Sequence, residues 1–384
     1  MVKNCRLSNL KLKKIFDFGK QPLGNGFLKK KDFNKEFFFR MEIGFCNKSK
    51  LVQLLSQPPS KKMFHDNYPF FSSLSKNMQK HFQNTAKNIL KKFRKSKNFS
   101  IIELGSNDGI FLEFFKKNKI KHLGIEPAKN VAKISKSKKI NTLNSFFDNS
   151  CSKNIVKNFG EADIFYSANV MCHIPNIKNL SKNIQKVLKP NGFLIFEDPY
   201  LGDVIKKCSY DQIYDEHVFL FSLHSVKNIF KSIGMTLVDV EALNTHGGSM
   251  RYFVKNSKNS EPSNKVKKIL KHEVNIGITS FTGLNRLSKK IKKSKIDLIN
   301  LLHDLKSKGK TVAGYAATSK STTILNYCNI NKSLISYIND TTPIKIGKYS
   351  PGMHIPIKSY EYSKKNLPDY YFLFAWNHID EIIK

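Results

Sequence analysis

The stretch Phe99–Phe115, FSIIELGSNDGIFLEFF, decides the fold of this chain. A short apolar run, Ile101 to Leu104, leads into a loop bounded by Gly105 and Gly109, and a segment with helical apolar spacing follows. The order strand, glycine loop, helix is typical of a ligand-binding turn in an α/β sheet. The glycines let the backbone approach a ligand closely, and the amides that open the helix favour polar or anionic ligand groups.

Strands and helices alternate on both sides of this stretch. Upstream, apolar residues recur with helical spacing over 78–93. Downstream, two apolar runs at the end of the series are joined by a short link that contains glycine, which indicates a hairpin. The alternation predicts an α/β sheet with helices on both faces. The downstream strands are expected at 121–126, 163–168, 193–201, 235–244 and 248–256, and a helix is expected to stop at Pro190.

The chain divides by composition. After residue 258 a polar, lysine-rich segment passes into a helical pattern over 281–307, and a second strand–loop–helix begins at 310. A chain of 384 residues can hold two or three domains, each with a core of its own. We expect a small irregular N-terminal module at 1–65, a cofactor-binding domain at 66–258, a linker with a long helix at 259–310, and a smaller α/β module at 311–384.

Composition limits the protein class. Hydrophobic residues make up 40% of the chain, and no run of eighteen apolar residues predicts a membrane span. The first residues, MVKNCRLSNLKLKK, lack the apolar centre of a signal peptide, so we expect a cytoplasmic protein with no membrane partner. Six scattered cysteines do not form a disulfide framework in a chain of this length.

The net charge of +37 suggests nucleic acid, but its make-up argues against that partner. Only five of the 66 basic residues are arginine, the side chain that makes most bidentate contacts with bases. Lysine is spread along the whole chain, so runs such as RLSKKIKKSK (286–295) are expected to be solvated faces. We expect no nucleic-acid partner, although the charge can steer an anionic small substrate to its site.

The loop after the first strand of the central domain favours S-adenosylmethionine (SAM) over a dinucleotide. A dinucleotide needs G-x-G-x-x-G, and here Asp108 would repel a pyrophosphate. SAM has no phosphate and carries an ammonium and a sulfonium, which suit Glu103 and Asp108. Glu126, about twenty residues on, can accept both hydroxyls of a ribose, and the closing hairpin matches the reversed last strand of class I methyltransferases. The candidate cofactor residues are Glu103, Gly105, Asn107, Asp108, Gly109, Glu126 and Asn169.

Several further motifs, taken in order, resemble one family over nearly the whole chain. They are QPLGNGFL (21–28), LVQL (51–54), MFHDNYPFFSSLS (63–75), SANVMCHIPN (167–176), YDEHVFLFS (214–222), HGGSMRYFV (246–254), VAGYAATSKSTTILNYC (312–328), KIGKYSPGMHIPI (345–357) and PDYYFLFAWN (368–377). The chain is similar to the three-domain, SAM-dependent C-methyltransferases of nucleotide-linked 4-keto-deoxysugars. The resemblance implies an α/β fold with a class I (Rossmann-like) methyltransferase core, a small N-terminal module and a smaller C-terminal α/β module.

The resemblance also implies catalytic roles. In that family a carbon beside the ketone loses a proton, and the enolate attacks the methyl group. His217 would be the base and Glu216 would orient and charge it, while Tyr68, His173 and Tyr214 would hydrogen-bond the oxyanion or the sugar hydroxyls. A positioned base contributes about 10²–10⁴ in rate. The candidate substrate residues are His246, Ser249, Arg251, Lys320 and Trp376. Each of these residues also has a purely structural interpretation, such as packing for Tyr68 and Trp376 or helix capping for His173.

The chain departs from the family at its N-terminal module. The family holds a zinc ion there through two C-x-x-C pairs, but this chain keeps only Cys5 and Cys46 and has Ser8 and Ser49 in the other two places. Hydroxyls are poor zinc ligands, so we expect no tightly held zinc and a less stable module.

Two alternatives stay open from the sequence. One is methylation of an oxygen or nitrogen on a related sugar or small molecule, which does not need an enolate. The other is a basic nucleic-acid-binding protein with an inactive methyltransferase fold, which would bind duplexes with strong salt dependence. The sequence leaves the oligomeric state open.

Overall fold

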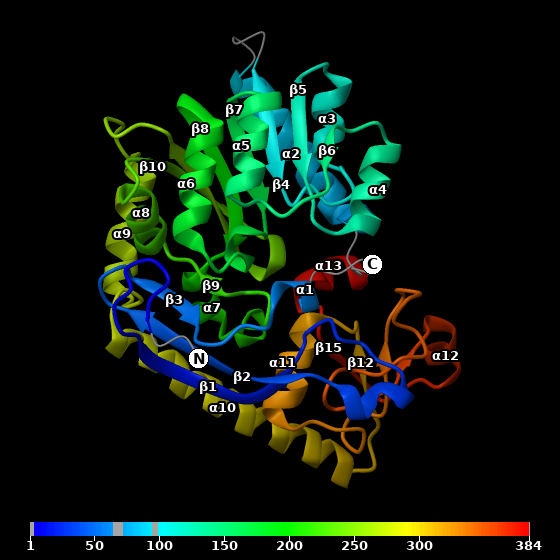
Figure 1. Cartoon of the computed structure of the whole chain (residues 1–384). Helices are drawn as coiled ribbons and strands as arrows, with labels where there is room; N and C mark the ends of the chain where they lie inside the picture. Colours follow the sequence, from blue (N-terminus) through cyan, green and yellow to red (C-terminus); the bar gives the residue numbers. More distant parts are fainter. Residues whose placement is uncertain (1–3, 64–71, 94–98, 384) are drawn as a thin grey trace.

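A seven-stranded sheet forms the centre of the molecule within the part of the chain that the computed structural model describes, residues 4–63, 72–93 and 99–383 (Figure 1). Its strand order is β10-β11-β8-β7-β4-β5-β6. Strands β8, β7, β4, β5 and β6 are parallel to one another. Strand β11 runs antiparallel to both β8 and β10, so the expected hairpin is confirmed. The strands are β4 (Ser100–Leu104), β5 (Lys121–Ile125), β6 (Thr142–Leu143), β7 (Ala162–Ala168), β8 (Leu188–Pro199), β10 (Thr236–Leu243) and β11 (Ser249–Lys255).

Helices cover both faces of this sheet because its strands are apolar on both sides. Ile101 points into a core with α2 and α3, and its neighbour Ile102 points into a core with α5, α6 and α8. The expected helix at 78–93 is observed as α2, and α6 ends at Val187, three residues before the expected stop. The helices of this domain are α2 (Lys76–Phe93), α3 (Leu112–Lys117), α4 (Lys129–Ser137), α5 (Asn149–Asn158), α6 (Ile177–Val187), α7 (Leu201–Lys207) and α8 (Leu223–Lys231).

The N-terminal module contains regular antiparallel strands where we expected irregular structure. Strands β1 (Lys13–Pro22), β2 (Phe38–Cys46) and β3 (Leu51–Leu54) pair in order, and β3 continues onto β9 (Phe219–Leu220) of the central domain. Alternating apolar residues such as Met41 and Ile43 form the core of this sheet, and that pattern was not used in the sequence prediction. The short α1 (Ser60–Met63) follows β3.

The C-terminal module is a second, smaller parallel sheet of order β14-β13-β12-β15. Its strands are β12 (Val312–Tyr315), β13 (Ile338–Asn339), β14 (Ile357–Lys358) and β15 (Tyr370–Leu373), and its helices are α11 (Ser319–Cys328), α12 (Tyr360–Lys365) and α13 (Ile379–Ile382).

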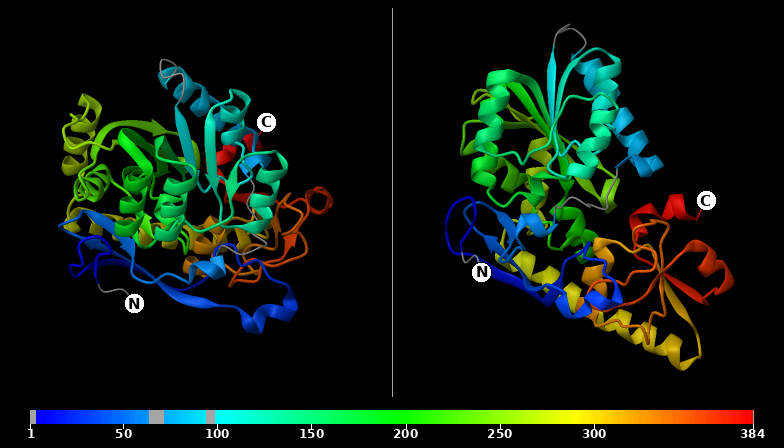
Figure 2. Two further views of the ribbon diagram at one scale, coloured as in Figure 1. Left: turned by 45° about the horizontal axis from the view of Figure 1, so that its top comes forward. Right: turned by 45° about the vertical axis from the view of Figure 1, so that its right-hand side comes forward.

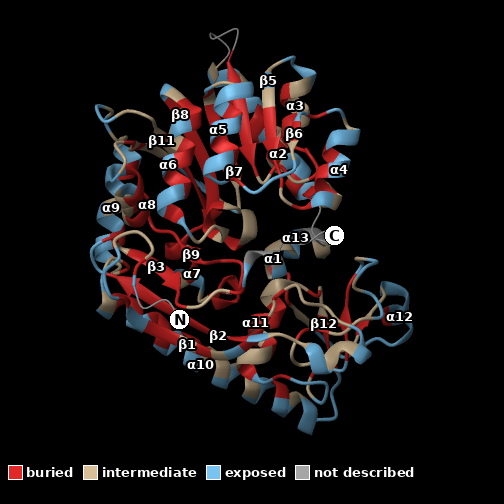
Figure 3. Ribbon diagram, in the orientation of Figure 1, coloured by how far each residue is buried: buried red, intermediate tan, exposed pale blue. Residues whose placement is uncertain are grey.

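One long helix connects the two smaller modules. After α9 (Asn264–Asn275), α10 (Phe281–Ser307) runs along the N-terminal sheet and on to the C-terminal module (Figures 1 and 2). Its bounds are those expected from the sequence. Leu284 and Leu287 pack into the core of the N-terminal sheet, and Leu302 packs into the C-terminal core. Buried residues concentrate in the strands, and helix faces turned outward are exposed (Figure 3). Among the described helices, none combines the length and apolarity that crossing a membrane requires.

Candidate active site

The glycine loop after β4 has the backbone that the sequence predicted. Gly105 and Gly109 have φ of +71° and +81°, in the region that favours glycine. A Cβ at Gly105 would lie 2.3 Å from Val170 Cγ2, and one at Gly109 would lie 2.4 Å from Ile140 Cδ1. A side chain at either position would therefore strain the backbone and displace the neighbouring side chains.

Three buried carboxyl groups surround this loop. Burial raises the pKa of Glu103 well above its ordinary value, and the neighbouring Asp108 and Glu126 raise it further. Within the described residues, one carboxyl oxygen of Glu103 and one of Asp108 have no hydrogen-bond partner. Glu126 instead accepts hydrogen bonds from the backbone amides of Asn107 (3.0 Å) and Ala128 (2.9 Å). A ligand that brings positive groups to this pocket would offset the cost of burying these acids, so the residues fit the ammonium and sulfonium of SAM.

The two candidate asparagines lie at the same edge of the sheet. Asn107 and Asn169 have φ of 48° and 56°, and each follows the end of a parallel strand. The amide of Asn169 donates to the carbonyl of Glu197 at 2.7 Å, and the Asn107 side chain accepts from the amide of Ser72 at 2.9 Å. Ligands bind at this edge in open α/β sheets. The contacts of these residues with the cofactor stay a prediction.

His217 and Tyr214 form a hydrogen-bonded pair whose proton positions follow from geometry. His217 Nδ1 lies 2.7 Å from the carbonyl oxygen of Gln212, and a carbonyl can only accept, so Nδ1 carries the proton. His217 Nε2 then has a free lone pair and accepts from the Tyr214 hydroxyl at 2.8 Å. Burial, with help from nearby His173, holds the pKa of His217 well below its ordinary value. The ring is therefore neutral near pH 7, which is the state that a base requires.

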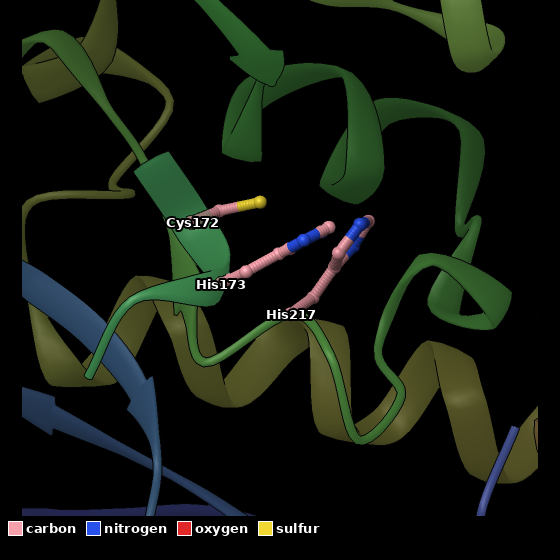
Figure 4. Close-up of side chains that lie close together, drawn as sticks. All are labelled: Cys172, His173 and His217. Carbon is pink, nitrogen blue, oxygen red and sulfur yellow. The ribbon is translucent and has the colours of Figure 1, made fainter. Parts of the chain in front are cut away.

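His173 lies beside this pair, as Figure 4 shows. The two imidazole centroids are 5.2 Å apart with an interplanar angle of 27°. Burial lowers the pKa of His173 to about 4, so this ring is also neutral at pH 7. The structure thus brings His173, Tyr214 and His217 together. Tyr68, which also belongs to the expected catalytic set, lies outside the described residues.

The orienting role expected for Glu216 stays a prediction, because the partner that the structure gives His217 Nδ1 is a backbone carbonyl. The Gln212 carbonyl holds the Nδ1 proton of His217, and Glu216 accepts a hydrogen bond from the side-chain amide of Asn25 at 2.8 Å. The adjacent Asp215 accepts from the amide of Gly24 at 2.9 Å. A turn before the base therefore binds two residues of the N-terminal module. Burial raises the pKa of Asp215 to about 6, and the Gly24 amide opposes this rise.

Three of the five expected substrate residues also lie together, at the contact between the central domain and the C-terminal module. Lys320 Nζ lies 3.4 Å from the carbonyl oxygen of His246 and 5.7 Å from the centroid of the Trp376 ring. The Trp376 indole donates to Asp211 at 2.8 Å, and the Gln212 side-chain amide donates to the His246 carbonyl. Burial lowers the pKa of Lys320 to about 8 and that of His246 to about 3.

The other two expected substrate residues point into the central domain. Arg251 donates to Glu197 through Nε and Nη2 at 3.1 and 3.0 Å, and its side chain is only 5% exposed. Nη2 also donates to Thr85 at 2.6 Å. Ser249 donates to the carbonyl of Thr245 at 3.0 Å. The guanidinium of Arg251 therefore neutralises a buried carboxylate, and a contact of this residue with the substrate stays a prediction.

The four positions that hold zinc in the resembling family converge in this chain as two mixed pairs. Cys5 Sγ lies 3.2 Å from Ser49 Oγ, and Cys46 Sγ lies 3.2 Å from Ser8 Oγ. Hydrogen bonds from the serines lower the pKa of Cys46 against the effect of burial. Two thiols and two hydroxyls thus form a hydrogen-bonded cluster, and the expected lack of tight zinc binding stays a prediction.

Some residues of the site were not predicted. Asp211 and Gln212 lie just before the motif YDEHVFLFS (214–222), and Asn25 lies in QPLGNGFL (21–28), but no role was assigned to these three residues from the sequence. Cys172 precedes His173 and projects toward the same histidine pair (Figure 4).

The strand order, the glycine loop and its acidic surroundings define the class of this protein, a SAM-dependent methyltransferase with a class I core. Three family models match in order along the chain: "Putative zinc binding domain" at 5–64, "Methyltransferase domain" at 71–240 and "C-methyltransferase C-terminal domain" at 244–384. The chain has the domain composition of a C-methyltransferase.

A curated relative is similar to this chain over nearly its whole length. The chain is 29% identical over 371 residues to the C-methyltransferase NovU of Streptomyces niveus. The aligned region covers 96% of this chain and 88% of that protein. Among solved structures, the magnesium protoporphyrin IX methyltransferase of Synechocystis PCC 6803 is similar with a TM-score of 0.37 and 11% identity, over 52% of this chain and 92% of that chain. A SAM-dependent methyltransferase from Anabaena variabilis has a TM-score of 0.36 and 13% identity, over 46% and 92%.

Proposed function

We propose that the chain methylates C3 of a nucleotide-linked 4-keto-deoxysugar through an enolate. The C-methyltransferase domain composition, the relative named as a C-methyltransferase and the motifs shared with the sugar-methylating family support this proposal. The observation that carries it is the pair formed by His217 and Tyr214. The pair offers a neutral imidazole lone pair next to a phenol, and it lies against His173, which follows β7, the strand beside β4 and its cofactor loop.

The chemistry that this pair performs is a proton removal. His217 Nε2 takes the proton from the carbon beside the ketone, and the electron pair of that C–H bond moves into the enolate. When substrate enters, the phenol of Tyr214 leaves Nε2 and donates a hydrogen bond to the enolate oxygen. This bond stabilises the negative charge that develops on the enolate. His173 provides a second donor on the same side. The proton on His217 leaves to solvent after the new C–C bond has formed.

SAM supplies the methyl group, already activated on a sulfonium, so the chain needs only to hold it in line with the carbanion. Gly105 and Gly109 give the close backbone approach, and the positive groups of SAM would favour the charged forms of the buried carboxyl groups of Glu103, Asp108 and Glu126 around the loop. No residue of the chain has to activate the methyl group.

The C-terminal module supplies the side that binds the nucleotide. Lys320 lies in the first turn of α11, where the helix N-terminus and the ammonium both favour a diphosphate. His246 and Trp376 lie against Lys320. Gln212 contacts both the substrate residues and the catalytic pair. Its side-chain amide donates to the His246 carbonyl, and its own carbonyl accepts from His217 Nδ1. Occupation of the substrate side can therefore influence the orientation of His217.

The test uses a panel of nucleotide-linked 4-keto-sugars. Incubated with the protein and S-adenosylhomocysteine in deuterated water, the true substrate should exchange its C3 hydrogen, and with SAM it should gain one methyl on carbon, as NMR would show. A methyl found on oxygen or nitrogen, without carbon exchange, would establish the O- or N-methyltransferase alternative. Salt-sensitive duplex binding without SAM binding would support the nucleic-acid alternative.

A further inference from the structure

Cys172, which the proposed methyl transfer does not use, lies with the two histidines of the active site in a cluster of soft metal donors. Cys172, His173 and His217 each offer one ligand atom, and these atoms all lie within 4.8 Å of one another. Figure 4 shows Cys172 and His173 projecting from the short helix η3 (Met171–His173) toward the His217 ring. Cys172 and His217 are 1% and 5% exposed, and His173 between them in the cluster is partly buried.

Two parts of the chain that are fixed independently hold these donors. η3 follows directly after β7 in the central sheet. His217 lies two residues before β9, which pairs with β3 of the N-terminal sheet. In a tetrahedral zinc site, neighbouring donors lie roughly 3.3–3.7 Å apart, given Zn–N near 2.1 Å and Zn–S near 2.3 Å. The three donors lie within 4.8 Å of one another, which exceeds this spacing by about 1–1.5 Å, a difference that side-chain rotation can close.

The hydrogen bonding of His217 is that of a metal ligand. Its Nδ1–H donates to the Gln212 carbonyl, so Nε2 carries the lone pair. Histidines that bind metals usually donate their second ring N–H to a carbonyl or carboxylate in this way. Two imidazole nitrogens and one sulfur form a donor set that suits zinc and its neighbours in the first transition row.

We propose that Cys172, His173 and His217 form a binding site for a zinc-like divalent ion, and that the bound ion blocks the enzyme. Binding replaces the thiol proton of Cys172 with the metal and releases that proton to solvent. The ion also takes the Nε2 lone pair of His217, the same pair that the proposed proton removal needs. The inhibitory part therefore rests on the proposed function, whereas the binding part does not.

Cobalt(II) provides a readout that is independent of activity. Titration of the metal-free full chain with cobalt chloride should produce a near-ultraviolet absorption band from sulfur-to-cobalt charge transfer, with about one ion bound per chain. The band should disappear in Cys172→Ala. It should persist in Cys46→Ala, which removes a matched buried cysteine from the N-terminal cluster. SAM binding by Cys172→Ala shows that this variant is folded. An unchanged band in Cys172→Ala, or no band in the unmodified chain, would overturn the site.

A gain-of-binding variant sharpens the test. The Tyr214 hydroxyl occupies Nε2 of His217 at 2.8 Å, so it competes with a metal for that lone pair. Tyr214→Phe should bind cobalt severalfold more tightly, and equal or weaker binding would contradict the proposed ligand atom.

Inhibition is measured separately with zinc chloride. Micromolar zinc should stop methyl transfer by the unmodified chain and a chelator should restore it, whereas Cys172→Ala should stay active at the same zinc concentration. If both proteins are inhibited equally, the blocking role is wrong. If cobalt binds through Cys172 but neither protein transfers a methyl group to any keto-sugar, the metal site stands and the proposed function fails.

Discussion

At the scale of single residues, the argument depends on the imidazole of His217. Glutamine at this position can accept a hydrogen bond but cannot carry a proton away from carbon. We expect His217→Gln to lower kcat by about 10²–10⁴ and to abolish C3 exchange while SAM affinity stays the same. Because its pKa lies below the ordinary 6.5 and only the neutral ring is active, kcat/KM of the unmodified enzyme should hold its plateau down to pH values below 6.5. Exchange that persists in His217→Gln would show that another group is the base.

Lys320 offers a second prediction at this scale. Burial lowers its pKa to about 8, so the ammonium loses its proton just above physiological pH. An anionic substrate needs the charged form, and kcat/KM should therefore fall as the pH rises through about 8. In Lys320→Arg the cation persists to far higher pH, so this break in the profile should disappear. A break that remains in the arginine variant would assign the titration to a different group.

At the scale of elements, the turn between β1 and η1 (Lys30–Lys35) connects all three modules. The Asn25 side chain donates to Glu216 at 2.8 Å and accepts from Ser319 at 3.2 Å. Asn25→Ala removes both bonds and leaves Glu216 buried without this donor, so we expect kcat to fall by about tenfold or more, with SAM affinity unchanged. Ser319→Ala removes only the bond on the C-terminal side and should reduce kcat much less. Equal losses in the two variants would mean that the contact with Glu216 has no special role.

The same turn explains a glycine. A Cβ at Gly24 would lie 2.7 Å from Asp215 Oδ1 and 3.0 Å from Ser319 Cβ, although its φ is not in the positive region. Glycine is therefore required at position 24 because two other modules lie too close for a side chain, and not because the backbone is strained.

The N-terminal sheet carries a prediction about metal. Ser8 and Ser49 each lie 3.2 Å from a cysteine sulfur, so the double change Ser8→Cys with Ser49→Cys would place four thiols around one point. We expect the double variant to retain about one zinc per chain after dialysis and to gain thermal stability, since a four-cysteine site is a common structural zinc site. The unmodified chain, washed with a mild chelator, should keep none at this position. Tight zinc in the N-terminal module of the unmodified chain, lost on Cys46→Ala, would contradict the expectation.

At the scale of the whole molecule, local patterns predicted local structure. The glycine loop, the hairpin β10–β11 and the bounds of α10 follow from periodicity and turn residues over short spans. Partners that lie far apart in sequence could not be found in this way. Asn25 and Glu216 are 191 residues apart, and Arg251 and Glu197 are 54 apart in adjacent strands. The N-terminal strands were missed for a different reason: their alternating apolar residues were not used, and the pairing of β3 with β9 from another domain could not be found from local patterns.

The charge of the whole molecule leads to the last prediction. A net charge of +37 attracts an anionic nucleotide-sugar and repels SAM, whose ammonium and sulfonium outweigh its one carboxylate. Salt screens both effects, with a Debye length of about 10 Å at 0.1 M and about 3 Å at 1 M. Raising the ionic strength from about 0.05 to 0.5 M should therefore lower kcat/KM for the sugar substrate severalfold, while SAM binding stays constant or becomes tighter. Calorimetry measures the change in SAM affinity with salt, and initial rates measure the change in kcat/KM for the sugar substrate, both on one preparation. If salt weakens SAM binding as much as it lowers kcat/KM, general damage to the fold, and not steering of the anion by the lysine-rich surface, would explain the loss.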